Sequence, residues 1–96
     1  MEGDEHQRLI RGVARGRRWL SEIINGHIPD LEALARRESR SPRSIRMTLS
    51  LALLDPVLIR AAIDGRLLRG YGVTRLADLP ARFEDQWAAL GLSRPH

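Results

Sequence analysis

Two prolines, each preceded by a residue that caps helices, divide the middle of this 96-residue chain into short segments. Pro42 follows Ser41, and Pro56 follows Asp55. Proline disfavours helical backbone at the residue before it, yet it suits the first turn of a new helix, where its missing N–H is not needed. The serine or aspartate can accept a hydrogen bond from a free amide of that turn. Each pair therefore ends one helix and begins the next.

Apolar residues recur at helical spacing in the remaining segments, whereas runs that alternate between apolar and polar residues are absent. The expected fold is therefore all-α, a small bundle of about five helices. The expected helices cover residues of about 5–25, 31–38, 42–53, 56–64 and 80–90, with a single turn near 74–79. Asp30 is the expected N-cap of the second helix.

Two spacings predict where helices pack. Gly12 and Gly16 form a GxxxG pattern inside the first expected helix, which in a chain of this kind indicates a close crossing with a neighbouring helix. Phe83, Trp87 and Leu90 make one apolar stripe on the last expected helix. We therefore expect this last helix to be structural.

Composition limits the classes of protein to which the chain can belong. Its 96 residues, 43% of them apolar, suffice for one small core, so residues 1–96 are expected to form a single domain. The chain has no cysteine, which excludes disulfides, thiolate metal sites and cysteine nucleophiles. No apolar run reaches the length of a membrane span, and the acidic start lacks the features of a signal peptide. We expect a cytoplasmic protein with no membrane partner.

Positive charge is concentrated in the first half of the chain. All 16 basic residues are arginine, and the formal net charge is +4. From Arg8 to Arg46, ten arginines stand against four acids, whereas the rest has six arginines and eight acids. Guanidinium groups form bidentate hydrogen bonds with phosphates and with guanine, so this asymmetry of charge favours a nucleic-acid partner. The alternative is an arginine bias of a GC-rich genome, with the arginines on solvated helix faces.

The segment 30–53 predicts a helix-turn-helix: a short helix, a turn of about four residues and a longer helix with a basic outer face. Ala35 is small where the two helices must cross, and Leu34 can clamp the pair against a core. The expected core face of the second helix of the pair comprises Ile45, Leu49, Ala52 and Leu53. Its N-terminal residues are then free to enter a major groove.

A series of short motifs adds a resemblance. They are Arg18-Trp19-Leu20, Asn25-Gly26, Leu31-Glu32-Ala33-Leu34-Ala35-Arg36-Arg37-Glu38, Ser41-Pro42-Arg43-Ser44-Ile45-Arg46, Leu54-Asp55-Pro56-Val57-Leu58-Ile59, Ile63-Asp64-Gly65-Arg66, Leu79-Pro80, Asp85-Gln86-Trp87 and Leu90-Gly91-Leu92. In order and spacing they resemble the C-terminal helical region of bacterial, often phage- or element-borne, serine recombinase-like proteins. That region contains a helix-turn-helix related to those of ParB-type partition proteins.

The resemblance covers residues of about 8–92 and implies DNA binding alone, because the recombinase catalytic domain lies outside this chain. Three positions depart from the family pattern. Ser39 stands where the family usually has glycine, Arg40 where it has an apolar residue, and Thr48 where it prefers an aliphatic one. The first two departures concern the geometry of the turn. The implied location is the cytoplasm, in association with the nucleoid.

The expected function is sequence-specific binding of duplex DNA by a recombinase-associated or regulatory module. The residues expected to contact bases are Arg43, Ser44, Arg46 and Met47. The residues expected to contact phosphates are Arg17, Arg18, Arg36, Arg37, Arg40 and Ser41. Specificity in helix-turn-helix proteins usually needs two half-sites, so we expect a homodimer or a tethered recombinase catalytic domain.

Other chemistry finds little support in the sequence. No serine has a histidine partner at a recognisable spacing, so we expect no enzyme activity. His6, His27 and His96 are scattered, so neither a metal nor another cofactor is expected. Trp19 and Trp87 could stack on single-stranded bases, but their apolar neighbours favour a role as core anchors.

The rival function comes from another class of protein. A helical protein–protein interaction adaptor, or an antitoxin-like subunit, would use apolar helix faces to bind its partner. The Leu67-Leu68 pair in the glycine-rich segment is the expected docking site for such a partner.

Overall fold

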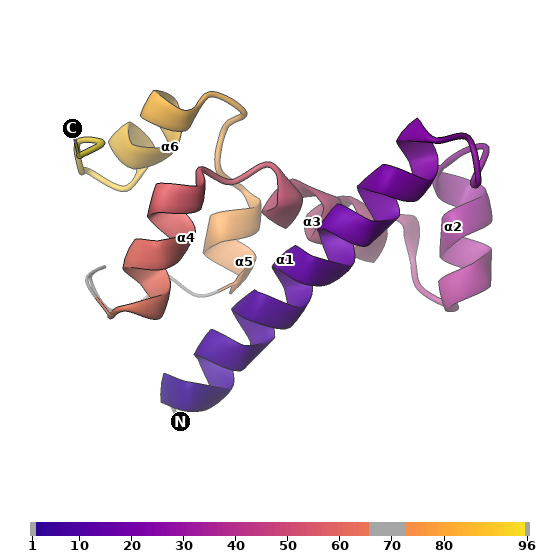
Figure 1. Ribbon diagram of the computed structural model, residues 1–96, viewed down its shortest axis with the longest axis horizontal. Coiled ribbons are helices and arrows are strands. Elements are labelled where there is room, and N and C mark those ends of the chain that lie inside the picture. Colours follow the sequence, from indigo (N-terminus) through magenta and orange to yellow (C-terminus); the bar gives the residue numbers. More distant parts are fainter. Residues whose placement is uncertain (1, 66–72, 96) are drawn as a thin grey trace.

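The computed structural model describes residues 2–65 and 73–95, and these residues form six helices and no strand (Figure 1). The helices are α1 (Glu2–Ile24), α2 (Leu31–Glu38), α3 (Pro42–Ala52), α4 (Pro56–Ile63), α5 (Val73–Ala77) and α6 (Phe83–Ala89). The predicted all-α class is confirmed, and α5 is the expected single turn. The Leu67-Leu68 pair lies outside the described residues.

Three predicted N-caps are confirmed. The Asp30 side chain accepts a hydrogen bond from the amide of Ala33 at 2.8 Å, and the Ser41 hydroxyl accepts one from the amide of Ser44 at 3.1 Å. The carboxylate of Asp55 caps α4 through the amide of the second helical residue at 3.0 Å. Capping by these side chains fixes where α2, α3 and α4 begin.

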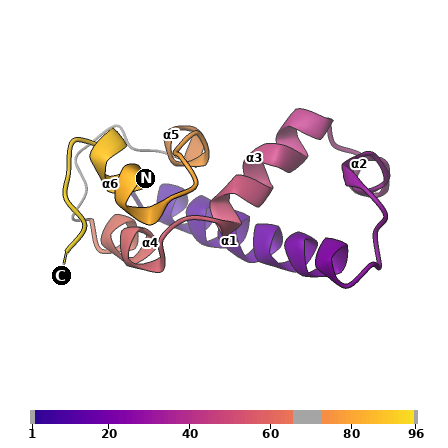
Figure 2. The same ribbon diagram turned by 90° about the horizontal axis from the view of Figure 1, so that it is seen from above.

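Helix α1 crosses α3 through its two glycines, as the GxxxG spacing predicts. Figure 2 shows α3 lying across the middle of the long α1. A β-carbon on Gly16 would overlap the carbonyl oxygen of Thr48, and one on Gly12 would come within 2.6 Å of Leu51 Cδ1. Only glycine therefore permits this separation of the two helices.

Buried residues gather in two clusters that share α1 and α3. The larger cluster joins Leu9 and Val13 of α1 to the end of α3 and to α4, α5 and α6. The smaller cluster joins Trp19 of α1 to Leu34 and Ala35 of α2 and to Ile45 of α3. Figure 1 accordingly shows α2 at one end of α1 and α4–α6 toward the other. One tryptophan lies in each cluster, which confirms that both are core anchors.

Two predicted core positions are wrong. Leu53 is 51% exposed, because α3 ends at Ala52 and the residue after it leaves the inward face. Leu51 is buried in its place. Phe83 is 43% exposed, because α6 begins at this residue rather than at Pro80, so the buried part of the stripe starts one turn later.

A buried polar network holds α6 against the start of α4. Asp55 is fully buried, and its carboxylate accepts hydrogen bonds from Trp87 Nε1 at 2.9 Å and from Arg94 Nε at 2.5 Å. Gln86 accepts from the Asp55 amide at 2.8 Å and donates to the carbonyls of Leu53 and Pro80. Every member thus has a partner, as a buried polar group requires.

Burial would raise the pKa of the Asp55 carboxyl, but hydrogen bonds from Arg94, Trp87 and the Val57 amide outweigh it and hold this pKa below its ordinary value. The carboxylate therefore binds its proton less readily in the folded than in the unfolded chain. Its contribution to stability is present above the unfolded pKa and is lost as the pH falls through the folded pKa.

Substituting Gly16→Ala tests the close crossing. Alanine favours a helix over glycine by up to about 1 kcal/mol, so without the contact the variant would gain stability. We expect instead a net loss of about 1–3 kcal/mol, because the Thr48 carbonyl is backbone and cannot rotate away. Gly12→Ala is the matched control and should lose less, since Leu51 is a flexible side chain. Thermal unfolding measures both, and an unchanged or stabilised Gly16→Ala would contradict the contact.

Substituting Asp55→Asn tests the polar network. We expect the free energy of unfolding to fall by about 2 kcal/mol at pH 7, because charged hydrogen bonds are lost. The difference from wild type should shrink as the pH falls below the ordinary pKa of an aspartate, because the unfolded chain then binds the proton more readily than the folded one. Urea unfolding at pH 7 and pH 3 measures the effect. Asp78→Asn, on an exposed carboxylate, is the control, and equal losses in the two variants would refute a special role of Asp55.

Candidate nucleic-acid interface

Helices α2 and α3 are joined by the three residues 39–41, and their axes cross steeply (Figures 1 and 2). The joint turns at Ser39, whose φ of 54° is left-handed and is the only positive φ of a non-glycine residue in the described ranges. The end of α2 is capped by two backbone hydrogen bonds: the Ser39 amide donates to the carbonyl of Arg36, and the Arg40 amide donates to the carbonyl of Ala35. Serine adopts this conformation at a cost that glycine avoids.

The smaller core cluster holds the two helices in place. Trp19 is fully buried against Leu34, Ala35 and Ile45. The guanidinium of Arg40 lies over the Trp19 ring, 5.9 Å from its centroid, in a cation–π contact. The position of α3 therefore depends on one large aromatic side chain supplied by α1.

The N-terminal half of α3 presents two free cations to solvent. Arg43 and Arg46 are exposed, and within the described parts of the chain neither has an ion-pair partner. Ser44 is half-buried and its hydroxyl lies 3.5 Å from Arg40 Nη1. Met47 differs from its predicted exposure, because its side chain packs against the larger core cluster. The four predicted base-contacting residues are thus brought together, but Met47 is partly withdrawn.

A basic hollow of about 340 Å³ lies between α1 and this half of α3. Its lining residues are Arg8, Arg40, Ser41, Arg43, Ser44, Met47, Thr48 and Leu51. They include three arginines and two serines but no acid. Such a set of donors suits an anionic oxygen, and the N-terminus of α3 adds its partial positive charge.

Arg8 is a residue of this hollow that the sequence reasoning missed as a contact. It lies one turn before Gly12, on the side of α1 that α3 approaches. The signal was available in the sequence, because the GxxxG pattern marks the face on which the neighbour packs and Arg8 continues that face by four residues. Recognising it required knowing that the neighbour is α3.

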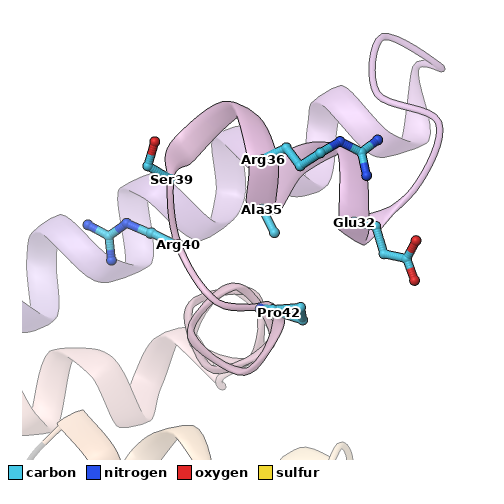
Figure 3. Close-up of a pocket in the computed structure, with 6 residues that line it drawn as sticks. All are labelled: Glu32, Ala35, Arg36, Ser39, Arg40 and Pro42. Atoms are coloured by element: carbon cyan, nitrogen blue, oxygen red, sulfur yellow. The ribbon is translucent and has the colours of Figure 1, made fainter.

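Figure 3 shows a second hollow, of about 500 Å³, at the turn itself. The side chain of Ala35 points toward the start of α3, where Pro42 lies; Arg36 and Glu32 lie on one side, and Ser39 and Arg40 lie on the other. Because it includes a carboxylate, this hollow offers a phosphate a weaker field than the basic hollow does. Arg36 is exposed at its rim.

Arg37, a predicted phosphate contact, instead forms ion pairs within the chain. Its guanidinium donates to both carboxylate oxygens of Glu22 on α1 and, at 2.9 Å, to Glu38. The hydrogen bond from Arg37 holds the pKa of Glu22 below its ordinary value, and the same pair raises the pKa of Arg37. Arg37 therefore ties α2 to α1 and offers no free charge to a ligand.

Two further predicted phosphate contacts are not beside the basic hollow. Arg17 lines a different hollow near the end of α3, and Arg18 is exposed on α1. Ser41 does lie in the basic hollow, where its oxygen already caps α3. The structure thus gathers Arg40 and Ser41 beside the first turns of α3, whereas Arg17 and Arg18 lie elsewhere on α1.

In residues 2–65 and 73–95, no three histidine, aspartate or glutamate side chains are grouped so that they could hold a metal ion. No helix of those ranges is long and apolar enough to cross a membrane.

Comparisons with protein-family models, with curated proteins and with solved structures find no match to this chain. The resemblance to serine recombinase-like proteins therefore stays an expectation that is carried by the motifs alone.

The ion pair of Arg37 makes a separate prediction. Arg37→Ala and Glu22→Gln should each lower the melting temperature at pH 7, and the double variant should be no less stable than Arg37→Ala alone, since that substitution already removes the contact with Glu22. The loss should vanish as the pH falls through the depressed pKa of Glu22, where the pair no longer forms. Arg36→Ala is the control. Additive losses in the double variant would contradict the pairing.

Proposed function

We propose that this chain binds duplex DNA, with α2 and α3 acting as a helix-turn-helix and the N-terminal half of α3 directed at the major groove. One observation carries the proposal. Arg43 and Arg46 are exposed cations without an ion-pair partner among the described residues, and Arg43 is one of three arginines that line a hollow with no acid. A surface of this kind attracts a polyanion and has no compensating charge of its own.

The positions of these side chains suggest a division of roles. Arg43 and Arg46 lie on the exposed face of α3, where a guanidinium can donate two hydrogen bonds to the O6 and N7 atoms of guanine. Arg8 and Arg40 come from α1 and from the turn, so they flank α3 as phosphate contacts do. Ser41 adds a hydroxyl at the start of the helix. In this arrangement the chain contributes binding without catalysis, to recombination or to regulation, alone or tethered to a catalytic domain.

An adaptor that binds another protein is the second candidate function. It is favoured by exposed apolar side chains at Leu53 and Phe83, which lie away from the basic hollow. Heparin chromatography at graded salt separates the two candidates, because a DNA-binding surface is retained to higher salt than an apolar docking surface.

Fluorescence anisotropy with labelled duplexes at several salt concentrations tests DNA binding. Arg8 and Arg40, as the two arginine–phosphate contacts of one copy, give a slope of about −2 in a plot of log affinity against log salt. Arg8→Ala should make this slope shallower by about one and weaken binding to every sequence alike. Arg43→Ala should instead reduce the discrimination between a selected site and a random duplex by about 1–3 kcal/mol.

Arg82→Ala is the matched control for net charge. Arg82 is an exposed arginine at the start of α6, and it pairs weakly with Glu84 and Asp85. Its loss removes the same charge without touching the basic hollow, so affinity and slope should stay near the wild-type values. A salt-independent affinity would overturn the proposal. If Arg43→Ala weakened all sequences equally, α3 would not be the helix that reads bases.

A further inference from the structure

An apolar hollow lies on the flank of α1 opposite the basic hollow. It has a volume of about 300 Å³, and Leu53, Pro56 and Phe83 are among its lining residues. Arg17 lines it and Arg8 lines the basic hollow. These two arginines are nine residues apart on one helix, which turns their side chains about 180° from each other. A partner seated in the apolar hollow would therefore leave the basic hollow open.

Two large side chains that line this hollow remain partly in water. Leu53 is 51% exposed and Phe83 is 43% exposed, although most other large apolar side chains nearby are buried. A concave surface that is lined by exposed apolar groups is more often an interaction site than a surface that stays in contact with solvent. Both side chains are accessible walls of the hollow, so one such surface can offer apolar contacts to another.

Charges around this hollow are complementary to each other. Arg17 on α1 has no ion-pair partner within the described residues. Next to Phe83, the first turn of α6 carries Glu84 and Asp85, of which Arg82 offsets one charge. A net negative charge thus follows Phe83, while a positive charge stands on the helix across the hollow. A surface with both signs fits a copy of itself rotated by half a turn.

From this combination we infer that the apolar hollow is a self-association surface, and that its occupant is a second copy of this chain. In a twofold arrangement, Leu53 and Phe83 of each copy pack into the hollow of the other. Arg17 of each copy then faces the acidic first turn of α6 of the other. The basic hollows stay exposed in such a dimer, which matches the two half-sites that paired helix-turn-helix modules read.

Sedimentation velocity without DNA, over protein concentrations up to the millimolar range, tests this inference independently of DNA binding. Wild type should dimerise reversibly. Leu53→Glu and Arg17→Glu should each weaken the dimer by about tenfold or more, since each places a charge against apolar or like-charged groups. The double variant Arg17→Glu/Glu84→Arg keeps the net charge and should restore association, because it exchanges the two signs.

Ile24→Glu is the matched control, because Ile24 is exposed but does not line this hollow. It should leave the dimer unchanged, and circular dichroism confirms that each variant is folded. A wild type that stays monomeric at every concentration overturns the inference and leaves the hollow to a different partner. A dimer that resists both Leu53→Glu and Arg17→Glu, or a double variant that fails to associate, also overturns it.

Discussion

Helices α1 and α3 approach so closely at Gly16 that the carbonyl of Thr48 occupies the space of a β-carbon. Both core clusters are built on either side of this crossing, because α1 and α3 contribute to each of them. The crossing also decides which arginines of α1 meet α3. Arg8 lies on the flank where the basic hollow forms, and Arg17 lies on the opposite flank beside the apolar one. A contact between two backbones thus determines the distribution of charge over the surface.

The two ends of the molecule are stabilised by different physical means. Around Trp19, apolar contact and one cation over the ring hold α2 and α3. Around Asp55, a buried carboxylate collects donors from Trp87 and Arg94 and so ties the C-terminal segment to α4. Such a carboxylate is costly to bury and is tolerated only because its hydrogen bonds are complete. The C-terminal end consequently loses stability in acid, as does the Arg37–Glu22 pair that ties α2 to α1.

Local signals predicted most of the fold from the sequence. Asp30, Ser41 and Asp55 each determine a helix start through their own side chain, so their neighbours along the chain suffice to place α2, α3 and α4. Contacts between distant segments were not predictable in the same way. The Asp55 network joins residues more than thirty positions apart. The pairing of Arg37 with Glu22, and the place of Arg8 beside α3, likewise depend on which helices are neighbours, and no spacing along the chain reveals that.

The chain carries only two tryptophans, and the fold assigns one to each cluster. Their surroundings are electrically opposite: Arg40 lies over the ring of Trp19, whereas the indole N–H of Trp87 donates to the carboxylate of Asp55. Trp19 also keeps a buried indole N–H without an acceptor among the described residues. Each core cluster therefore contains its own intrinsic fluorophore. Emission from Trp19 reports on the turn between α2 and α3, and emission from Trp87 reports on the C-terminal helices.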